Sequence, residues 1–209
     1  MTYSVLIVDD QALPRQLFER IVEGAERYRV AACIETAKVA DVYCARGDVD
    51  LVLMDVVMND GSSGLEAAAR IKRSYPRVKV ILVTSMPDAL FLRRARELGV
   101  DSFWYKEAQA SPLLDVMDRT MAGERVFPDA PPKSALGVAK SSEFTERELE
   151  VLRLLAEGLT DREIAERLFV GVSTVRYHVN NLMAKTGFAS RTELAVNAVR
   201  AGIVVPGIG

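Results

Sequence analysis

The chain has 209 residues, of which 49% are hydrophobic and 27% charged, and its formal net charge is -2. This length and composition suit two modest globular domains, and the small net charge argues against a general polyanion-binding protein. No apolar run approaches the ~18 residues of a membrane span, and Asp9 and Asp10 come too early for a signal peptide. We therefore expect a cytoplasmic protein without a membrane segment. Cys33 and Cys44 should stay reduced, because they lack metal or redox spacing.

The first half of the chain alternates short apolar runs with segments of helical periodicity. The apolar runs, which predict strands, cover residues 5–10, 29–34, 51–55, 78–83 and 102–105. Helices are predicted around residues 17–22, 39–45, 65–72 and 89–98, and from the Ser111-Pro112 pair onward. Strands that alternate with helices in this way indicate an α/β fold with a doubly wound, five-stranded parallel sheet.

Polar side chains stand where four of the predicted strands end. They are Asp9, Asp10, Asp55, Thr84 and Lys106. The carboxyl ends of parallel strands share one edge of the sheet, so these side chains should converge there. Three ionised carboxylates in one pocket need a cation between them, and an all-oxygen ligand set suits Mg²⁺. Each residue alone is more often a turn, cap or surface residue, but together they predict phosphoryl transfer onto a carboxylate.

Residues 1–122 resemble the receiver domain of bacterial two-component response regulators, a flavodoxin-like fold. The residues that carry the resemblance are Asp9, Asp10, Asp55, Thr84, Phe103 and Lys106. The resemblance implies that Mg²⁺ binds to Asp9, Asp10, Asp55 and the backbone carbonyl of Val57. It also implies that Asp55 takes a phosphoryl group from a sensor histidine kinase and that Thr84 and Phe103 then rearrange. The only histidine, His178, lies in the other half of the chain, so the phosphoryl donor must be another protein.

Two features depart from the receiver pattern. Asn59 stands where the family usually has a proline, and Gly64 comes one residue later than expected, so the loop after Asp55 carries an extra residue. This loop borders the predicted metal site, and we expect it to influence metal affinity, phosphate lifetime or kinase recognition. The second departure is Glu107, which replaces the proline that commonly follows the lysine.

The alternating pattern breaks between residues 123 and 142. Two adjacent prolines, Pro131-Pro132, lie among scattered Gly and Ser residues. This composition predicts an exposed, partly extended linker between a first domain at residues 1–122 and a second at 143–209.

The second domain is predicted to be all-helical. Thr145 and Glu148 form a capping box at the start of its first helix, Thr160 caps a short second helix, the third begins near Ser173, and the fourth begins near Thr192. A short helix, a tight turn and a helix with a polar face make a helix-turn-helix candidate. The polar face of the third helix holds Ser173, Arg176, Tyr177, Asn180 and Asn181. From spacing alone, a solvated surface is an equal alternative, and His178 is predicted to be a packing residue.

Residues 144–152, 158–165 and 173–179 resemble a LuxR-type DNA-binding domain. The resemblance implies that Arg176, Tyr177 and Asn180 face the DNA groove, that Lys185 contacts the backbone, and that the last helix mediates dimerisation on DNA. Asn180 replaces a basic residue common in the family, and Asp161 replaces the usual Asn. Residues 171–209 hold four Arg and Lys against one acid, so this end is locally basic.

The two halves together resemble a response regulator of the NarL/FixJ type. We therefore predict a transcription factor that is not an enzyme, binds a double-stranded operator, and dimerises when phosphorylated or DNA-bound. An aspartate-dependent phosphohydrolase is disfavoured because Val57 replaces its second Asp. A phosphate-independent interaction module is favoured mainly by the altered loop, while the intact acidic set, Thr84 and Lys106 count against it. An RNA-binding output domain is disfavoured because its helical arrangement would lack this helix-turn-helix motif.

Overall fold

The computed structural model describes residues 2–106 and 112–207, so Glu107 and Ser111 lie outside the described residues. The chain divides into two compact units, one formed by Met1–Ser85 with Ala89–Pro131 and the other by Met86–Asp88 with Pro132–Gly209. Within the described parts of both units, no helix combines the length and the apolar composition needed to cross a membrane.

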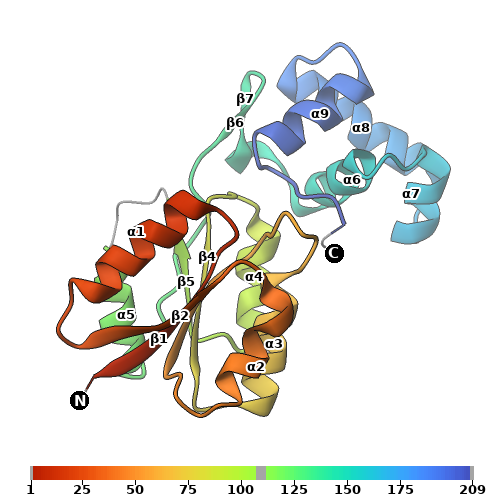
Figure 1. Cartoon of the computed structure of the whole chain (residues 1–209). Helices are drawn as coiled ribbons and strands as arrows, with labels where there is room; N and C mark the ends of the chain where they lie inside the picture. The colour runs from red at the N-terminus through yellow and green to blue at the C-terminus, as the bar shows by residue number, and fades with distance from the viewer. Residues whose placement is uncertain (1, 107–111, 208–209) are drawn as a thin grey trace. The chain divides into compact units, whose positions relative to one another are not determined.

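The N-terminal unit is a five-stranded parallel sheet covered by helices (Figure 1). Its strands are β1 (Tyr3–Val8), β2 (Tyr28–Ile34), β3 (Leu51–Asp55), β4 (Lys79–Thr84) and β5 (Ser102–Tyr105). Its helices are α1 (Ala12–Glu23), the 3-10 turn η1 (Ala37–Val39), α2 (Ala40–Cys44), α3 (Gly64–Ser74), α4 (Ala89–Glu97) and α5 (Leu113–Met121). The strand order β2-β1-β3-β4-β5 reverses direction between β1 and β3, where an open sheet forms its ligand crevice.

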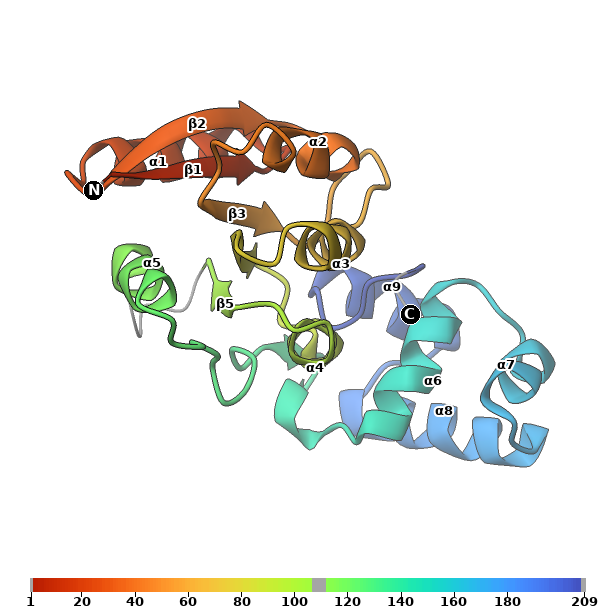
Figure 2. The same ribbon diagram turned by 90° about the horizontal axis from the view of Figure 1, so that it is seen from below.

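The sheet is buried because helices cover both of its faces. Helices α1 and α5 lie on one face, and α2, α3 and α4 lie on the other (Figures 1 and 2). Phe18 and Val22 of α1 and Val116 of α5 pack against inward-facing strand residues such as Leu53. All five residues of β3 are buried, which explains why the sequence shows a continuous apolar run there rather than alternation. The predicted sheet is confirmed.

The segment predicted as an exposed linker, residues 123–142, is structured at both ends. At its start, the Phe103 amide donates to the Val126 carbonyl (2.9 Å), so the chain returns along β5 after α5. At its end, β6 (Ala135–Leu136) and β7 (Ala139–Lys140) form a hairpin whose Leu136 packs into the C-terminal core. Gly137, at φ 61°, allows the tight turn. Gly123 and Gly137 lie in turns, while Pro128, Pro131 and Pro132 lie in a stretch without regular structure between the two structured ends.

After this hairpin, the C-terminal unit continues along the chain with a 3-10 turn, η2 (Ser141–Glu143), and then four helices. The helices are α6 (Glu146–Ala156), α7 (Asp161–Leu168), α8 (Val172–Thr186) and α9 (Arg191–Arg200). Both predicted caps are present: the Thr145 side chain accepts from the Glu148 amide, and the Thr160 side chain accepts from the Glu163 amide. Phe169, in the left-handed conformation at φ 54°, ends α7 and produces the turn into α8. The all-helical prediction is confirmed.

Candidate functional site

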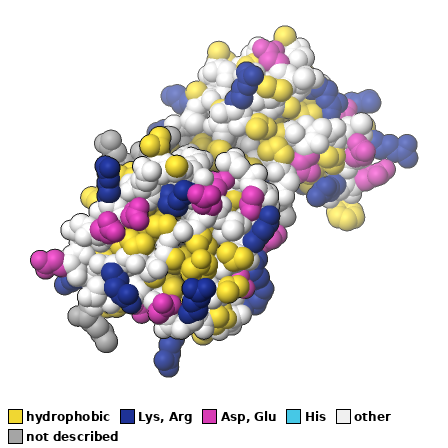
Figure 3. All heavy atoms as spheres, in the orientation of Figure 1, with side chains coloured by type: hydrophobic (Ala, Val, Ile, Leu, Met, Phe, Trp, Pro, Cys, Tyr) yellow, Lys and Arg dark blue, Asp and Glu magenta, His cyan; other side chains and the backbone are white. Residues whose placement is uncertain are grey.

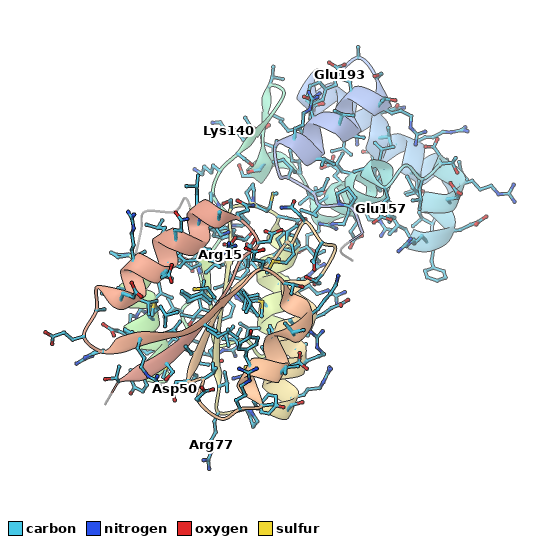
Figure 4. The ribbon with its side chains drawn as sticks, viewed as in Figure 1. Arg15, Asp50, Arg77, Lys140, Glu157 and Glu193 are labelled. Carbon is cyan, nitrogen blue, oxygen red and sulfur yellow. The ribbon has the colours of Figure 1, made fainter. Side chains whose placement is uncertain are left out.

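Three carboxylates meet at the carboxyl edge of the sheet. Asp9 and Asp10 follow β1, and Asp55 ends β3, which pairs with β1 in parallel. One oxygen from each of the three side chains can be chosen so that all lie within 4.8 Å of one another. In Figure 4 the labelled Arg15, which donates to the Asp9 carbonyl (2.7 Å), marks this edge, and Asp50 marks the amino end of the strands. The predicted convergence of the three acids is therefore present.

Lys106 brings a positive charge into the cluster. Its Nζ lies 2.7 Å from an Asp9 carboxylate oxygen and 3.2 Å from an Asp55 carboxylate oxygen. The Lys106 amide donates to the Thr84 carbonyl (2.9 Å), which continues the pairing of β5 with β4 and fixes the base of the side chain. One ammonium group thus faces three carboxyl groups, so the site retains an excess of negative charge when all are ionised.

The Asp55 carboxyl is strongly perturbed by this environment. Burial raises the pKa of Asp55 against the opposing effect of Lys106, the Asp9 and Asp10 charges add to the rise, and the net result is a pKa of about 7. Its side chain is only 5% exposed. A group with such a pKa is easily neutralised by a proton unless a second cation stabilises its ionised form.

The donor set fits Mg²⁺. Asp10 Oδ1 is buried and has no hydrogen-bond partner among the described residues, while Asp10 Oδ2 accepts from the Asn59 amide (2.5 Å). Asp9 Oδ1 accepts from the Gln11 amide (2.9 Å), which fixes the Asp9 carboxylate. A buried carboxylate oxygen without a donor is costly in a protein unless an ion binds it, and hard divalent cations prefer oxygen ligands. Asp9, Asp10 and Asp55 could together hold such an ion.

Two further predicted residues lie on the neighbouring strands, and a third, Val57, lies in the loop after Asp55. Thr84 ends β4 beside the cluster and is 1% exposed. Phe103 lies in β5, is 1% exposed, and packs edge-on against Tyr105 with ring centroids 5.0 Å apart. Val57 pairs with Ser63 across the loop after Asp55 in an isolated antiparallel bridge. The strands thus bring Thr84 and Lys106 to the acids, while Phe103 lies farther back in β5.

Helix α8 of the C-terminal unit exposes a polar face. Arg176, Tyr177 and Asn180 are exposed, whereas Val175 and Val179 on the opposite side are buried. Tyr177 is 63% exposed, so its phenol is accessible to a ligand. His178 is half-buried and lies edge-on against the Tyr177 ring at 5.5 Å. The three residues predicted to face DNA therefore lie on the side of α8 away from its buried valines.

Acidic partners compensate several cations of this unit. Asp161 Oδ2 accepts from Arg176 Nε (3.3 Å), and Asp161 Oδ1 accepts from Arg191 Nη1 (3.0 Å). Lys185 Nζ donates to Glu148 Oε2 (2.7 Å) and to the Glu143 carbonyl (2.9 Å). On the face seen in Figure 3, acidic and basic side chains are interspersed over both units. Sequence reasoning missed these pairings, although the substitution at Asp161 was a signal.

Comparisons with known protein families agree with this architecture. The model of the response regulator receiver domain matches residues 5–118, and the model of bacterial regulatory proteins of the luxR family matches residues 142–198. The chain belongs to the response regulators. It carries a LuxR-type DNA-binding domain and is a transcription factor of this family, whose members are generally not enzymes.

Similar proteins extend over the whole response regulator. The response regulator proteins VraR of Staphylococcus epidermidis and Staphylococcus aureus are each 32% identical to it, over 98% of this chain and 100% of the relative. Among solved structures, an RcsB–DNA complex has a TM-score of 0.63 at 20% identity and covers 95% of this chain and 98% of that one. A LuxR-family response regulator from Aurantimonas has a TM-score of 0.56 at 25% identity and covers 60% of this chain and 89% of that one.

Proposed function

We propose that Asp55 of this response regulator accepts a phosphoryl group from a partner histidine kinase, with Mg²⁺ held by Asp9, Asp10 and Asp55. The single observation that carries the proposal is the position of Lys106 Nζ, 3.2 Å from Asp55 within the three-acid cluster. A nucleophile, a positive charge and a cation-binding set at one edge are the parts that phosphoryl transfer requires.

Each residue of the site would have a separate role in this phosphoryl transfer. An Asp55 oxygen attacks phosphorus as the bond to the donor imidazole nitrogen breaks, and that nitrogen retains the bonding electron pair. Bound Mg²⁺ supplies charge neutralisation and orientation. Lys106 can move its ammonium from Asp9 and Asp55 to a phosphoryl oxygen, and the Thr84 hydroxyl can donate to another. Val57 would contribute its backbone carbonyl to the metal, and Thr84 and Phe103 would rearrange in the phosphorylated form.

We further propose that phosphorylation favours a homodimer that binds two half-sites of a double-stranded operator in the cytoplasm. Arg176, Tyr177 and Asn180 would contact base edges, and Lys185 would contact the phosphate backbone of the DNA. The exposed face of α8 supports the first three roles. The Glu148 ion pair makes Lys185 a weaker phosphate contact than its sequence position suggests. RcsB, which shares the fold, has been solved bound to DNA.

The acceptor role is tested by the mass and oligomeric state of the full chain after incubation with acetyl phosphate and Mg²⁺. We expect one added phosphoryl group together with dimerisation, both absent in Asp55→Asn. A phosphoryl adduct that persists in Asp55→Asn would place the acceptor elsewhere. If no adduct formed at any Mg²⁺ concentration, the receiver would serve only as a scaffold for DNA binding.

The base-reading role is tested with Tyr177→Ala, because the side chain carries no charge. Selection from a random duplex library should give a changed sequence preference. The dependence of affinity on salt should stay the same, since no phosphate contact is lost. An equal loss of affinity for all sequences would contradict base reading by Tyr177.

A further inference from the structure

The loop after Asp55, which carries the extra residue, is closed by backbone contacts at its base and at its tip. Val57 and Ser63 pair at its base, and the Gly61 amide donates to the Met58 carbonyl (3.2 Å) at its tip. Gly61 adopts φ 76°, the left-handed conformation that this turn needs. Met58 is 4% exposed, which fixes the first side of the tip in the core. The loop therefore has a defined position beside the three acids.

Asp60 attaches the other side of the tip to the segment after β2. Its Oδ2 accepts from Thr36 Oγ1 (2.7 Å) and lies 3.1 Å from Lys38 Nζ. Its Oδ1 accepts from the amide (2.8 Å) and hydroxyl (2.6 Å) of Ser62. The Ser62 hydroxyl oxygen in turn accepts from the Ala37 amide (3.2 Å). Two side chains of the loop thus hold it against residues 36–38, and we call this set of contacts the Asp60 clamp.

The Asp60 clamp is built for a carboxylate. Hydrogen bonds from Ser62 and Thr36 hold the pKa of Asp60 far below its ordinary value, so the group is ionised at any pH where the protein works. An amide at this position could not accept from Thr36 and Lys38 on one oxygen and from Ser62 on the other.

The clamp is one residue away from the phospho-acceptor site. Asn59 directly precedes Asp60, and its amide donates to Asp10 Oδ2 (2.5 Å). That contact holds the Asp10 carboxylate with its other oxygen, Oδ1, buried and without a hydrogen-bond partner in the described parts of the chain. Because Met58 and Asp60 fix both neighbours of Asn59, the direction of the Asn59 amide is determined by these two anchors.

We propose that Asp60 is a positioning residue of the acceptor site, which acts through the Asn59 amide to orient Asp10 for a divalent cation. The inference rests on the proposed function, because it assumes that Asp10 binds Mg²⁺. It also gives the loop with the extra residue a role, since Asp60 in this loop contacts Thr36 and Lys38. Residues that orient a metal ligand from outside the ligand set commonly change metal affinity by about 10–100-fold when they are removed.

The test uses the full chain and Mg²⁺ alone, with the dissociation constant measured by calorimetry and the Asn59 amide followed by NMR. Asp60→Ala should raise the dissociation constant about 10-fold, and Thr36→Val should raise it less. The double variant should have the same dissociation constant as Asp60→Ala alone, because both substitutions remove the same contact. Both variants should shift the Asn59 amide resonance. The matched control is Asp48→Ala, an exposed acid in the turn before β3, which should change neither quantity.

A second measurement separates positioning from simple stability. In Asp60→Ala, phosphorylation of Asp55 by acetyl phosphate should be slow at low Mg²⁺ and return to the wild-type rate when Mg²⁺ is saturating. Unchanged Mg²⁺ affinity in Asp60→Ala and Thr36→Val, with normal binding by the wild type, would overturn the inference. Failure of the wild type itself to bind Mg²⁺ would instead overturn the proposed function. If Asp60→Ala does not fold, Thr36→Val and Asp60→Asn carry the same test.

Discussion

Asp101 should be a main stabilising residue of the receiver unit, at the end of the sheet opposite the acidic site. Its Oδ2 accepts from Lys72 Nζ of α3 (2.7 Å) and from the Val80 amide of β4 (2.9 Å), and its Oδ1 accepts from Lys79 Nζ (3.0 Å). Asp101 directly precedes β5, so one carboxylate joins a helix and two strands. Replacement by Asn keeps the shape but places an NH₂ group against an ammonium ion.

The loss of stability expected for Asp101→Asn depends on how well Lys72 and Lys79 are shielded from water. Removing one partner of a buried ion pair costs about 3–5 kcal/mol. Lys72 and Lys79 are 14% and 29% exposed as side chains, so water can partly solvate them once Asp101 is gone. We therefore expect Asp101→Asn to lower the free energy of unfolding by about 2–3 kcal/mol.

The pH dependence of this difference has a definite sign. Burial raises the pKa of Asp101, but hydrogen bonds from Lys72, the Val80 amide and Lys79 outweigh burial and leave it below its ordinary value. A carboxyl with a lowered pKa stabilises the fold above its unfolded-state pKa of about 3.9 and loses this effect as pH falls through the folded-state pKa. The gap between wild type and Asp101→Asn should therefore be constant from about pH 5 to 7 and shrink below about pH 4.

Urea unfolding followed by Trp104 fluorescence measures this gap, because the only tryptophan lies in β5. Asp115→Asn is the control: Asp115 forms an exposed pair with Arg119 at 3.6 Å, which should contribute less than about 0.5 kcal/mol. Equal small effects of the two substitutions, or a gap that widens on acidification, would refute the reasoning.

Three further substitutions test other parts of the structure. Gly64→Ala places a Cβ 1.9 Å from the Asp55 carbonyl oxygen, and should lower the urea stability of the receiver unit by about 2–4 kcal/mol. Glu148→Gln leaves the Lys185 ammonium without its buried counter-charge, and should lower the thermal stability of the C-terminal unit by about 1–3 kcal/mol, measured by circular dichroism. Asp161→Asn releases Arg176 and Arg191 from one carboxylate. It should raise affinity for random duplex DNA and steepen the salt dependence by about 0.9 in logarithmic slope, as measured by fluorescence anisotropy.

The parts of the site that depend on strand ends could be predicted from the sequence. Parallel pairing of β1, β3, β4 and β5 leaves little choice about where Asp9, Asp55, Thr84 and Lys106 lie, so local apolar runs were sufficient evidence. The helix caps at Thr145 and Thr160 were equally local, because each cap involves residues three apart.

Contacts between residues far apart in the sequence could not be predicted in this way. The Asp60–Thr36 and Lys185–Glu148 bonds join side chains 24 and 37 residues apart, and neither follows from periodicity or a motif. The β6–β7 hairpin was missed for another reason: Gly and Pro are typical of linkers and of tight turns alike. Only the burial of Leu136 and Ala139, both 2% exposed, distinguishes the two.

On both proposed functional surfaces of this response regulator, a cationic side chain is paired with carboxylates of the same chain. Lys106 is bound by Asp9 and Asp55, and Arg176 is bound by Asp161. A phosphoryl group at Lys106, or a DNA base edge at Arg176, would therefore have to compete with an existing partner, and its net gain would be the difference between two charge-assisted interactions. The two exchanges differ in cost. Lys106, 10% exposed, gives up a buried pair, whereas Arg176, 69% exposed, gives up one that water already screens. Ligand exchange at Lys106 should thus alter the receiver core, while exchange at Arg176 should leave α8 in place.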